Sequence, residues 1–152
     1  MADDQSRPVA VYVLILFMLF QGLSGLAGGA GLVLDPTGES LKLPLSWLDD
    51  SPFNNYLIPG LILLIVLGLL PIAVCYGLWR KSRGSWFGAL LVGAALIIWI
   101  AVQILVVGYH SQPPLQLIYG SVGLIVLILV FIPTVRDYCL NSQHDGRRLS
   151  RR

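Results

Sequence analysis

The sequence predicts an all-α protein embedded in a membrane and built as an up-down four-helix bundle. Hydrophobic residues make up 56% of its 152 residues and charged residues only 12%, with a mean hydropathy of +0.78. Soluble domains carry about 25% charged residues. The apolar residues gather in four continuous runs without Asp, Glu, Lys, Arg or His, and continuous runs favour helices over an alternating β-barrel. This composition excludes a disordered chain, a disulfide-rich secreted domain and an ordinary soluble enzyme.

The four predicted spans belong to a single domain, residues 1–152. The first span follows Arg7, and its short apolar core followed by small residues also matches a cleavable signal peptide. We expect the segment to be retained, and its removal would not change the orientation of the other spans. The spans are placed at residues 9–34, 56–79, 86–109 and 115–135.

The connections between the spans differ in length. Residues 35–55 form a sizeable extracytoplasmic loop, which begins with the turn sequence Asp35-Pro36-Thr37-Gly38. The connections at 80–85 and 110–114 are short, so that the helices they join must be antiparallel neighbours.

Two prolines, Pro59 and Pro71, lie inside the second span. Each removes an intrahelical hydrogen bond and invites a kink. Such prolines are tolerated in a membrane helix when a neighbouring group satisfies the freed carbonyl. The pair Ser51-Pro52 is typical of a helix N-terminus, which predicts that this helix begins near Pro52.

Basic residues are sorted to one side of the predicted membrane. Nine of the ten lie before the first span, in the 80–85 connection or after the fourth span, and only Lys42 lies on the other side. The positive-inside rule then places both termini in the cytoplasm, in a plasma or inner membrane, with 136–152 as a basic tail. This allocation gives no reason to expect nucleic-acid binding. Contact of the tail with anionic lipid headgroups is possible, but a role in topology is favoured.

Aromatic residues agree with this orientation, because amphipathic rings prefer the membrane interfaces. The rings expected at the cytoplasmic interface are those of Tyr76, Trp79, Trp86, Phe87 and Tyr138.

The predicted spans contain no Asp, Glu, Lys, Arg or His, and this absence argues against most functions that need an ionisable group within the membrane. Proton-coupled transport normally uses an intramembrane carboxylate or histidine, and a bis-histidine haem needs ligands within the spans. Cys75 and Cys139 form no CxxC motif and are expected to be free thiols. The sequence therefore predicts no catalytic residue, metal site or cofactor. An enzyme that pairs His110 with Asp49 or Asp50 ranks last among the possible functions.

Uncharged polar residues form a predicted polar seam in the half of the bundle nearer the 35–55 loop. Gln21 and Trp99 are expected at the same membrane depth, and Gln103 follows Trp99 by four residues on one helix face. Hydrogen bonding between helices is the favoured role. The alternative is a ligand pocket, whose mouth would also include Gln112, Gln116, Asp49 and Asp50. The seam consists of Gln21, Ser24, Trp99, Gln103, His110, Asn54 and Asn55.

Small residues recur at four-residue spacing in two spans, which lets a second helix approach closely. They are Gly25 and Gly29 in the first span, Gly28 of the same span, which follows Ser24 by four residues, and Ala89 and Gly93 in the third. We expect packing within the monomer, with a dimer interface as the alternative.

Several segments give the chain a family resemblance. They are Leu34-Asp35-Pro36-Thr37-Gly38, Ser51-Pro52-Phe53, Tyr56-Leu57-Ile58-Pro59-Gly60-Leu61 and Trp99-Ile100-Ala101-Val102-Gln103 with Gly108-Tyr109. With these segments the chain resembles uncharacterised prokaryotic membrane proteins of four helices, DoxX-like in layout. The resemblance implies a four-span fold and transfers no catalytic residue. The small multidrug transporters are similar in size, but their glutamate in the first membrane helix has no counterpart here.

The sequence thus predicts a non-enzymatic structural or accessory membrane protein that contacts lipids and other membrane subunits. The alternative is a protein that binds or transports a lipid or another small hydrophobic ligand through a pocket at the polar seam.

Overall fold

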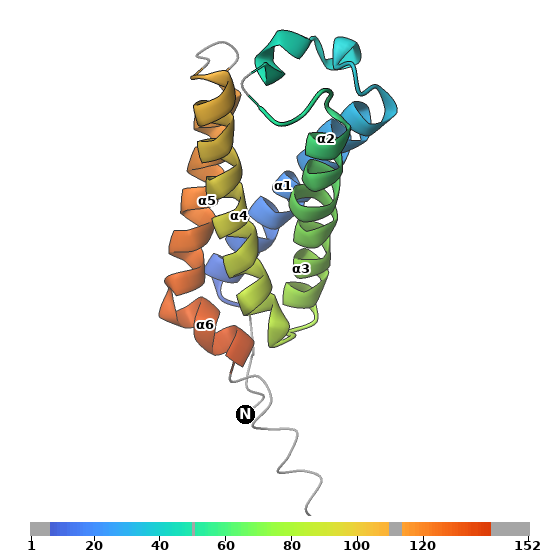
Figure 1. Ribbon diagram of the computed structural model, residues 1–152. Coiled ribbons are helices and arrows are strands. Elements are labelled where there is room, and N and C mark those ends of the chain that lie inside the picture. Colours follow the sequence, from blue (N-terminus) through green and yellow to red (C-terminus); the bar gives the residue numbers. More distant parts are fainter. Residues whose placement is uncertain (1–6, 50, 110–113, 141–152) are drawn as a thin grey trace, which may run out of the picture.

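The computed structural model describes residues 7–49, 51–109 and 114–140, and the described chain is helical without strands. Three helical segments are long and apolar enough to cross a membrane. They are α1 (Val9–Leu34), the segment Leu57–Trp79, and α4 (Gly84–Val107). A fourth crossing exists if α5 (Leu115–Phe131) and α6 (Pro133–Leu140) count as one broken span. The prediction of an all-helical, membrane-type chain is therefore confirmed (Figure 1).

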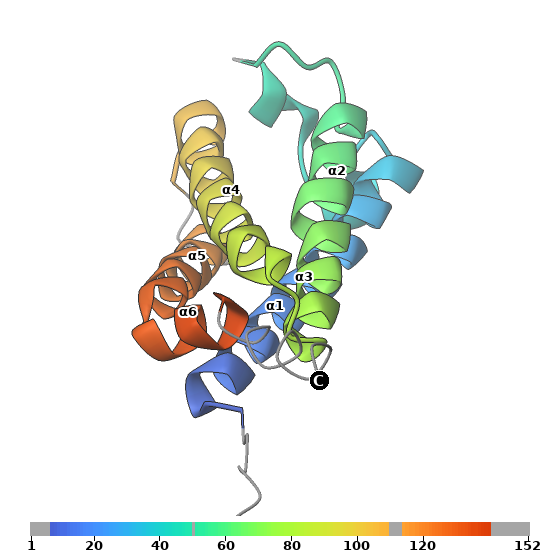
Figure 2. The same cartoon turned by 90° about the horizontal axis from the view of Figure 1, so that it is seen from below.

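The helices run between two ends of the molecule, which we call the basic end and the loop end. The basic end holds the start of α1, the connection between Trp79 and Gly84, and α6, while the loop end holds the connection after α1 (Figure 1). Arg7 belongs to the basic end, because it contacts Trp79 and Tyr138. α4 and α5 lie side by side and diverge from α2 toward the loop end, as Figures 1 and 2 both show.

The segment Leu57–Trp79 is one helix with a widened turn. It consists of α2 (Leu57–Leu64), the π-helical turn η3 (Ile65–Leu69) and α3 (Leu70–Trp79). A start near Pro52 is wrong, because α2 begins at Leu57. The Ser51 hydroxyl accepts a hydrogen bond from the Phe53 N–H (3.2 Å) in a local turn that precedes the helix. Pro59 lies in the first turn of α2, where a missing N–H costs little.

The prediction of a helix over residues 115–135 is wrong at its end. α5 stops at Phe131, and α6 leaves at an angle of 67°. The cause is Pro133, which disfavours helical backbone at the residue before it. Ile132 accordingly has φ −64° and ψ 127°. The predicted tail 136–152 therefore begins inside a helix, and residues 141–152 lie outside the described residues.

Glycines set the distance between α1 and the Leu57–Trp79 helix. A Cβ built on Gly25 would collide with the Leu67 carbonyl, and one on Gly29 would come within 2.5 Å of the Leu64 nitrogen. Because these neighbours are backbone atoms, no side chain can move aside. The two helices therefore touch backbone to backbone along this line.

The described core has two unequal parts. The larger cluster joins α1, η3, α3, α4, α5 and α6, and the smaller cluster at the loop end consists of Leu32, Leu48 and Tyr56. Fully buried side chains of the larger cluster include Leu14, Met18, Leu78, Val92 and Val126.

The connection after α1 is held by short polar contacts. The Asp35 carboxylate accepts hydrogen bonds from the Thr37 N–H and hydroxyl and from the Ser40 N–H, the last at 2.8 Å. The Tyr56 hydroxyl donates to the Pro44 carbonyl at 2.8 Å. Two short 3-10 helices, η1 (Glu39–Leu41) and η2 (Leu45–Leu48), complete the connection.

We predict that Gly25→Ala destabilises the protein by about 1–3 kcal/mol, the usual cost of forcing extra volume into a packed core. Thermal or SDS-induced unfolding in detergent micelles measures this change. Gly120→Ala is the matched control, because its Cβ would meet nothing closer than 3.7 Å. Equal stability of the two variants would contradict the backbone contact.

We predict that the Asp35 turn loses stability in acid. The hydrogen bond from the Thr37 hydroxyl is the main cause that holds the pKa of the Asp35 carboxyl below its ordinary value. A lowered pKa in the folded state stabilises the fold above the unfolded pKa, and the gain is lost as pH falls through the folded pKa. The stability difference between wild type and Asp35→Asn should therefore be present at pH 7, begin to shrink below the ordinary Asp pKa of about 4, and disappear once the pH is below the lowered pKa of the folded state. A difference independent of pH would contradict this role.

Candidate functional site

Gln21 lies in the middle of α1 with only 2% of its surface exposed. Its Nε2 donates a hydrogen bond to the carbonyl oxygen of Leu67 at 3.1 Å. In an α-helix the Leu67 carbonyl would accept from the residue four positions later, which is Pro71, and proline has no N–H. Gln21 supplies the donor that Pro71 lacks, and it does so at the widened turn of the second span.

The other atom of the Gln21 amide is not satisfied. Among the described residues, the buried Oε1 of Gln21 has no hydrogen-bond partner. Exchanging the amide oxygen and nitrogen would place two acceptors against each other at Leu67, so the hydrogen bond to Leu67 fixes the orientation. A buried acceptor without a donor costs about 1–3 kcal/mol.

The structure does not join the central members of the predicted polar seam. The Ser24 hydroxyl donates within its own helix, to the Phe20 carbonyl (2.9 Å) and the Gln21 carbonyl (3.1 Å). Trp99 is half-buried and packs against the core cluster, and Gln103 is half-buried on the same helix. Within the described ranges, no hydrogen bond links Gln21 to Trp99 or Gln103.

The predicted mouth of the pocket is described only in part. Asn54 and Asn55 are exposed, and the Asn55 Oδ1 accepts from the Leu57 N–H at 3.0 Å at the start of α2. Gln116 Nε2 donates to the Gly108 carbonyl at 3.0 Å. His110, Gln112 and Asp50 lie outside the described residues.

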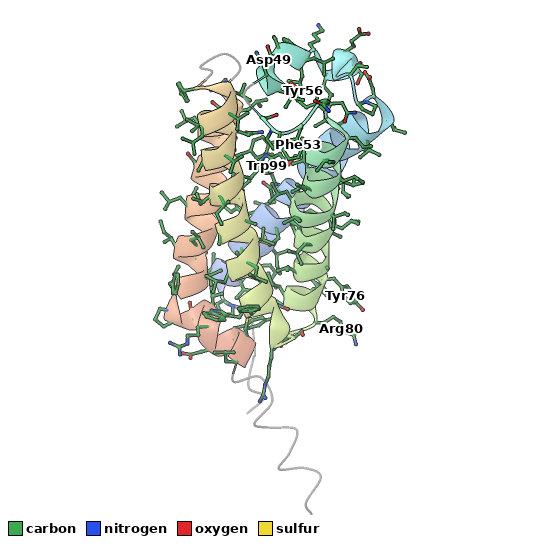
Figure 3. The ribbon with its side chains drawn as sticks, in the orientation of Figure 1. Asp49, Phe53, Tyr56, Tyr76, Arg80 and Trp99 are labelled. Atoms are coloured by element: carbon green, nitrogen blue, oxygen red, sulfur yellow. The ribbon has the colours of Figure 1, made fainter. Side chains whose placement is uncertain are left out.

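Three labelled aromatic side chains lie in the half of the molecule nearer the loop end (Figure 3). Figure 3 shows Phe53 and Tyr56 in the connection after α1, with Trp99 of α4 at a deeper level and Asp49 above them. Phe53 packs against the cluster of Leu32, Leu48 and Tyr56. This arrangement lies where the sequence predicts a ligand pocket.

The predicted helix-packing residues differ in how closely they approach a neighbouring helix. Gly25 and Gly29 contact the backbone of the second span, whereas Gly28 meets only the end of the Leu63 side chain at 3.3 Å. Ala89 is fully buried. A Cβ on Gly93 would lie 2.9 Å from Leu127 and 3.0 Å from Val126 of α5.

Arg7 organises the basic end, a role that sequence reasoning missed. Its Nε donates to the Tyr138 hydroxyl and its Nη2 to the Trp79 carbonyl, both at 3.0 Å. The guanidinium carbon also lies 4.1 Å from the centre of the Trp79 ring, within the range of a cation–π interaction. Arg7 thereby links the start of α1, the end of α3 and α6.

The amphipathic helix α6 closes the basic end. On the inner face of α6 the side chains of Val135 and Cys139 are fully buried, while Arg136 on the same helix is exposed. The Trp86 indole at the start of α4 donates to the Val130 carbonyl at 3.0 Å. Three of the five aromatic residues that the sequence assigns to the cytoplasmic interface, Trp79, Trp86 and Tyr138, therefore make contacts at this end of the molecule.

Chemical groups for catalysis are sparse in the part of the chain that the structure describes. There, no three His, Cys, Asp or Glu side chains form a group that could hold a metal ion. Cys75 and Cys139 are both free thiols.

Comparisons with protein-family models, with curated proteins and with solved structures find no match to this chain.

We predict that Gln21→Leu destabilises the protein by about 1 kcal/mol, because the Leu67 carbonyl loses a hydrogen-bond donor in the apolar interior of the helix pair. Pro71→Ala restores an N–H that can donate to the same carbonyl, so Gln21→Leu should cost less in that background. Comparing the two backgrounds cancels any gain from removing the unpaired Oε1. Unfolding of the four proteins in detergent measures the coupling, and Gln103→Leu is the control. Identical costs in the two backgrounds would refute the compensation.

We predict that Arg7→Gln weakens the docking of α6 by about 1–2 kcal/mol, because a cation–π contact and two hydrogen bonds are lost. Undocking exposes Cys139, so maleimide modification of this thiol should become faster, with the modified cysteine identified by mass spectrometry. Arg136→Gln removes the same charge from the surface of α6 and serves as the control. Equal labelling rates in the two variants would rule out the anchoring role of Arg7.

Proposed function

We propose that the chain is a four-span integral membrane protein with a structural or accessory role and without catalysis. Its partners are membrane lipids and other membrane-protein subunits, or a second copy of the chain. The observation that carries the proposal is the Gln21–Leu67 hydrogen bond. The most deeply buried polar side chain that the structure describes serves to join two helices, which is an architectural use.

The proposed topology has α1, the Leu57–Trp79 helix, α4 and α5 as antiparallel crossings, with both termini in the cytoplasm of a plasma or inner membrane. α5 has 17 residues, about 26 Å of helix, which is slightly short of a hydrocarbon core of about 30 Å. α6 then lies along the cytoplasmic interface as an amphipathic helix. The DoxX-like layout suggested by the sequence is compatible with this arrangement.

The outer faces of the helices support contact with lipid and with other subunits. Large apolar side chains are exposed on each of the proposed crossings, as suits a surface surrounded by acyl chains or by apolar helices. Examples are Leu16, Ile58, Ile98, Leu105 and Ile128.

Purification in a mild detergent followed by native mass spectrometry tests the accessory role. Stoichiometric protein partners, or a homodimer with lipids, are the expected result. A monomer that carries one small molecule and no protein partner would contradict the proposal. Cysteine accessibility from each side of sealed vesicles tests the orientation, with single cysteines introduced at Ser40 and Ser82.

A second candidate function is the binding or transport of a small hydrophobic ligand in the half of the bundle near the loop end. The unpaired Oε1 of Gln21 favours it, because a ligand with one N–H or O–H donor would satisfy this acceptor. Half-buried Trp99 and Gln103 lie on the helix opposite the second span. Loss of a co-purified small molecule in Gln21→Leu, and its retention in Gln103→Leu, would support this function over the accessory role.

A further inference from the structure

We infer that Tyr76 and Arg80 form a binding site for the phosphate of an anionic phospholipid at the basic end. The two residues lie one helical turn apart at the end of α3. Arg80 Nη1 donates to the Tyr76 hydroxyl at 3.1 Å, and the Arg80 guanidinium carbon lies 5.7 Å from the centre of the Tyr76 ring. The inference rests on the membrane placement proposed above, and it specifies one site at which the protein contacts a lipid.

Both side chains point toward the surroundings of the protein. Figure 3 shows Tyr76 and Arg80 on the outer side of α3, directed away from the other helices. Tyr76 is 63% exposed, a high value for an aromatic residue next to a buried core, and Arg80 is exposed as well. In a membrane, this side of α3 meets lipid.

The pair is already arranged as a set of donors. The Tyr76 hydroxyl accepts from Arg80, so that its own proton can be donated to a phosphate oxygen. The Arg80 guanidinium keeps further N–H groups in a planar fork, the geometry that binds phosphate with two parallel hydrogen bonds. Holding the guanidinium against the ring reduces the freedom that Arg80 would lose on binding.

The same helix face continues as an apolar track. Leu69 and Ala73 are exposed at positions seven and three residues before Tyr76, so they lie on its side of the helix. An acyl chain can run along this track while the headgroup phosphate rests at Arg80. This combination of a polar end and an apolar track fits a phospholipid. A free phosphate ion has no acyl chain and would not contact the track.

The depth of the pair agrees with a headgroup. Trp79 and Tyr138 lie at the same end of the molecule, where both contact Arg7, and aromatic rings of this kind occupy the interface of a membrane. α6 packs across this end rather than continuing the direction of α5. Arg80 follows directly after Trp79 and is therefore placed at the level of the phosphates.

The local charge selects an anionic lipid. Arg80, Lys81 and Arg83 lie in one connection, and the sequence contains no acidic residue between positions 51 and 136. Each basic residue near an anionic surface adds attraction for lipids such as phosphatidylglycerol. A zwitterionic headgroup offers the same phosphate but carries a cationic group that this region repels.

The test uses the full-length protein, delipidated in detergent and mixed with equal amounts of phosphatidylglycerol and phosphatidylcholine with identical acyl chains. Native mass spectrometry counts the bound lipids. We compare wild type with Tyr76→Phe and Arg80→Gln, and Arg136→Gln is the control that removes the same charge from the same end. Tyr76→Phe keeps the ring and its packing, so it tests the site even if Arg80→Gln fails to fold.

The expected result is a wild-type preference for phosphatidylglycerol. Arg80→Gln should lower its affinity about fivefold, the effect of one basic residue near an anionic surface. Tyr76→Phe should lower it about two- to threefold, since one neutral hydrogen bond is lost. Arg136→Gln should change it less than either variant, and Arg80→Lys should restore only part of the affinity because the planar fork is gone.

Three results would overturn the inference. Equal losses in Arg80→Gln and Arg136→Gln would reduce the effect to general charge. Equal binding of the two lipids would remove the anionic selectivity. Release of bound phosphatidylglycerol by millimolar inorganic phosphate would make the ion the ligand. None of these results bears on co-purified subunits, so failure of this site and failure of the accessory role can be told apart.

Discussion

The architecture depends on a carbonyl group, that of Leu67, whose usual α-helical donor position is occupied by a proline. Pro71 has no N–H for the Leu67 carbonyl, and in a membrane no water replaces it. Gln21 reaches this oxygen from α1 because Gly25, one turn further along, lets the two helices touch at their backbones. The proline, the glutamine and the glycine are therefore three parts of one constraint. Replacing the glutamine or the glycine would weaken the hydrogen bond to the Leu67 carbonyl, and replacing the proline would make that bond less necessary.

This constraint also separates the molecule into two regions. α1 and the Leu57–Trp79 helix are joined backbone to backbone, whereas α4 and α5 pack against each other through side chains near Gly93 and Gly123. The two regions share the core near the basic end and diverge toward the loop end (Figures 1 and 2). Trp99, Phe53 and Tyr56 lie in the diverging part, where residues of the predicted polar seam also lie.

Much of the fold could be predicted from the sequence, because hydrophobic length and the exclusion of charge determine which segments can cross a membrane. The first span has the predicted ends, Val9 and Leu34. The bend at Ile132 escaped prediction because the hydrophobic run continues past it, although Pro133 was the available signal. The need for a group to satisfy a proline-freed carbonyl was predictable, but its identity was not. Choosing Gln21 as the partner of Leu67 requires the rotation of both helices, which uniformly apolar spans do not encode.

The link between Arg7 and Tyr138 joins positions 131 residues apart in the chain. During synthesis, its acceptor on α6 emerges only after every preceding helix has left the ribosome. The contact is among the most non-local in the molecule, and closing so long a loop carries an entropic cost that a local contact does not. Arg7 therefore reaches all its partners only after the chain has been synthesised as far as Tyr138 and α6 has docked.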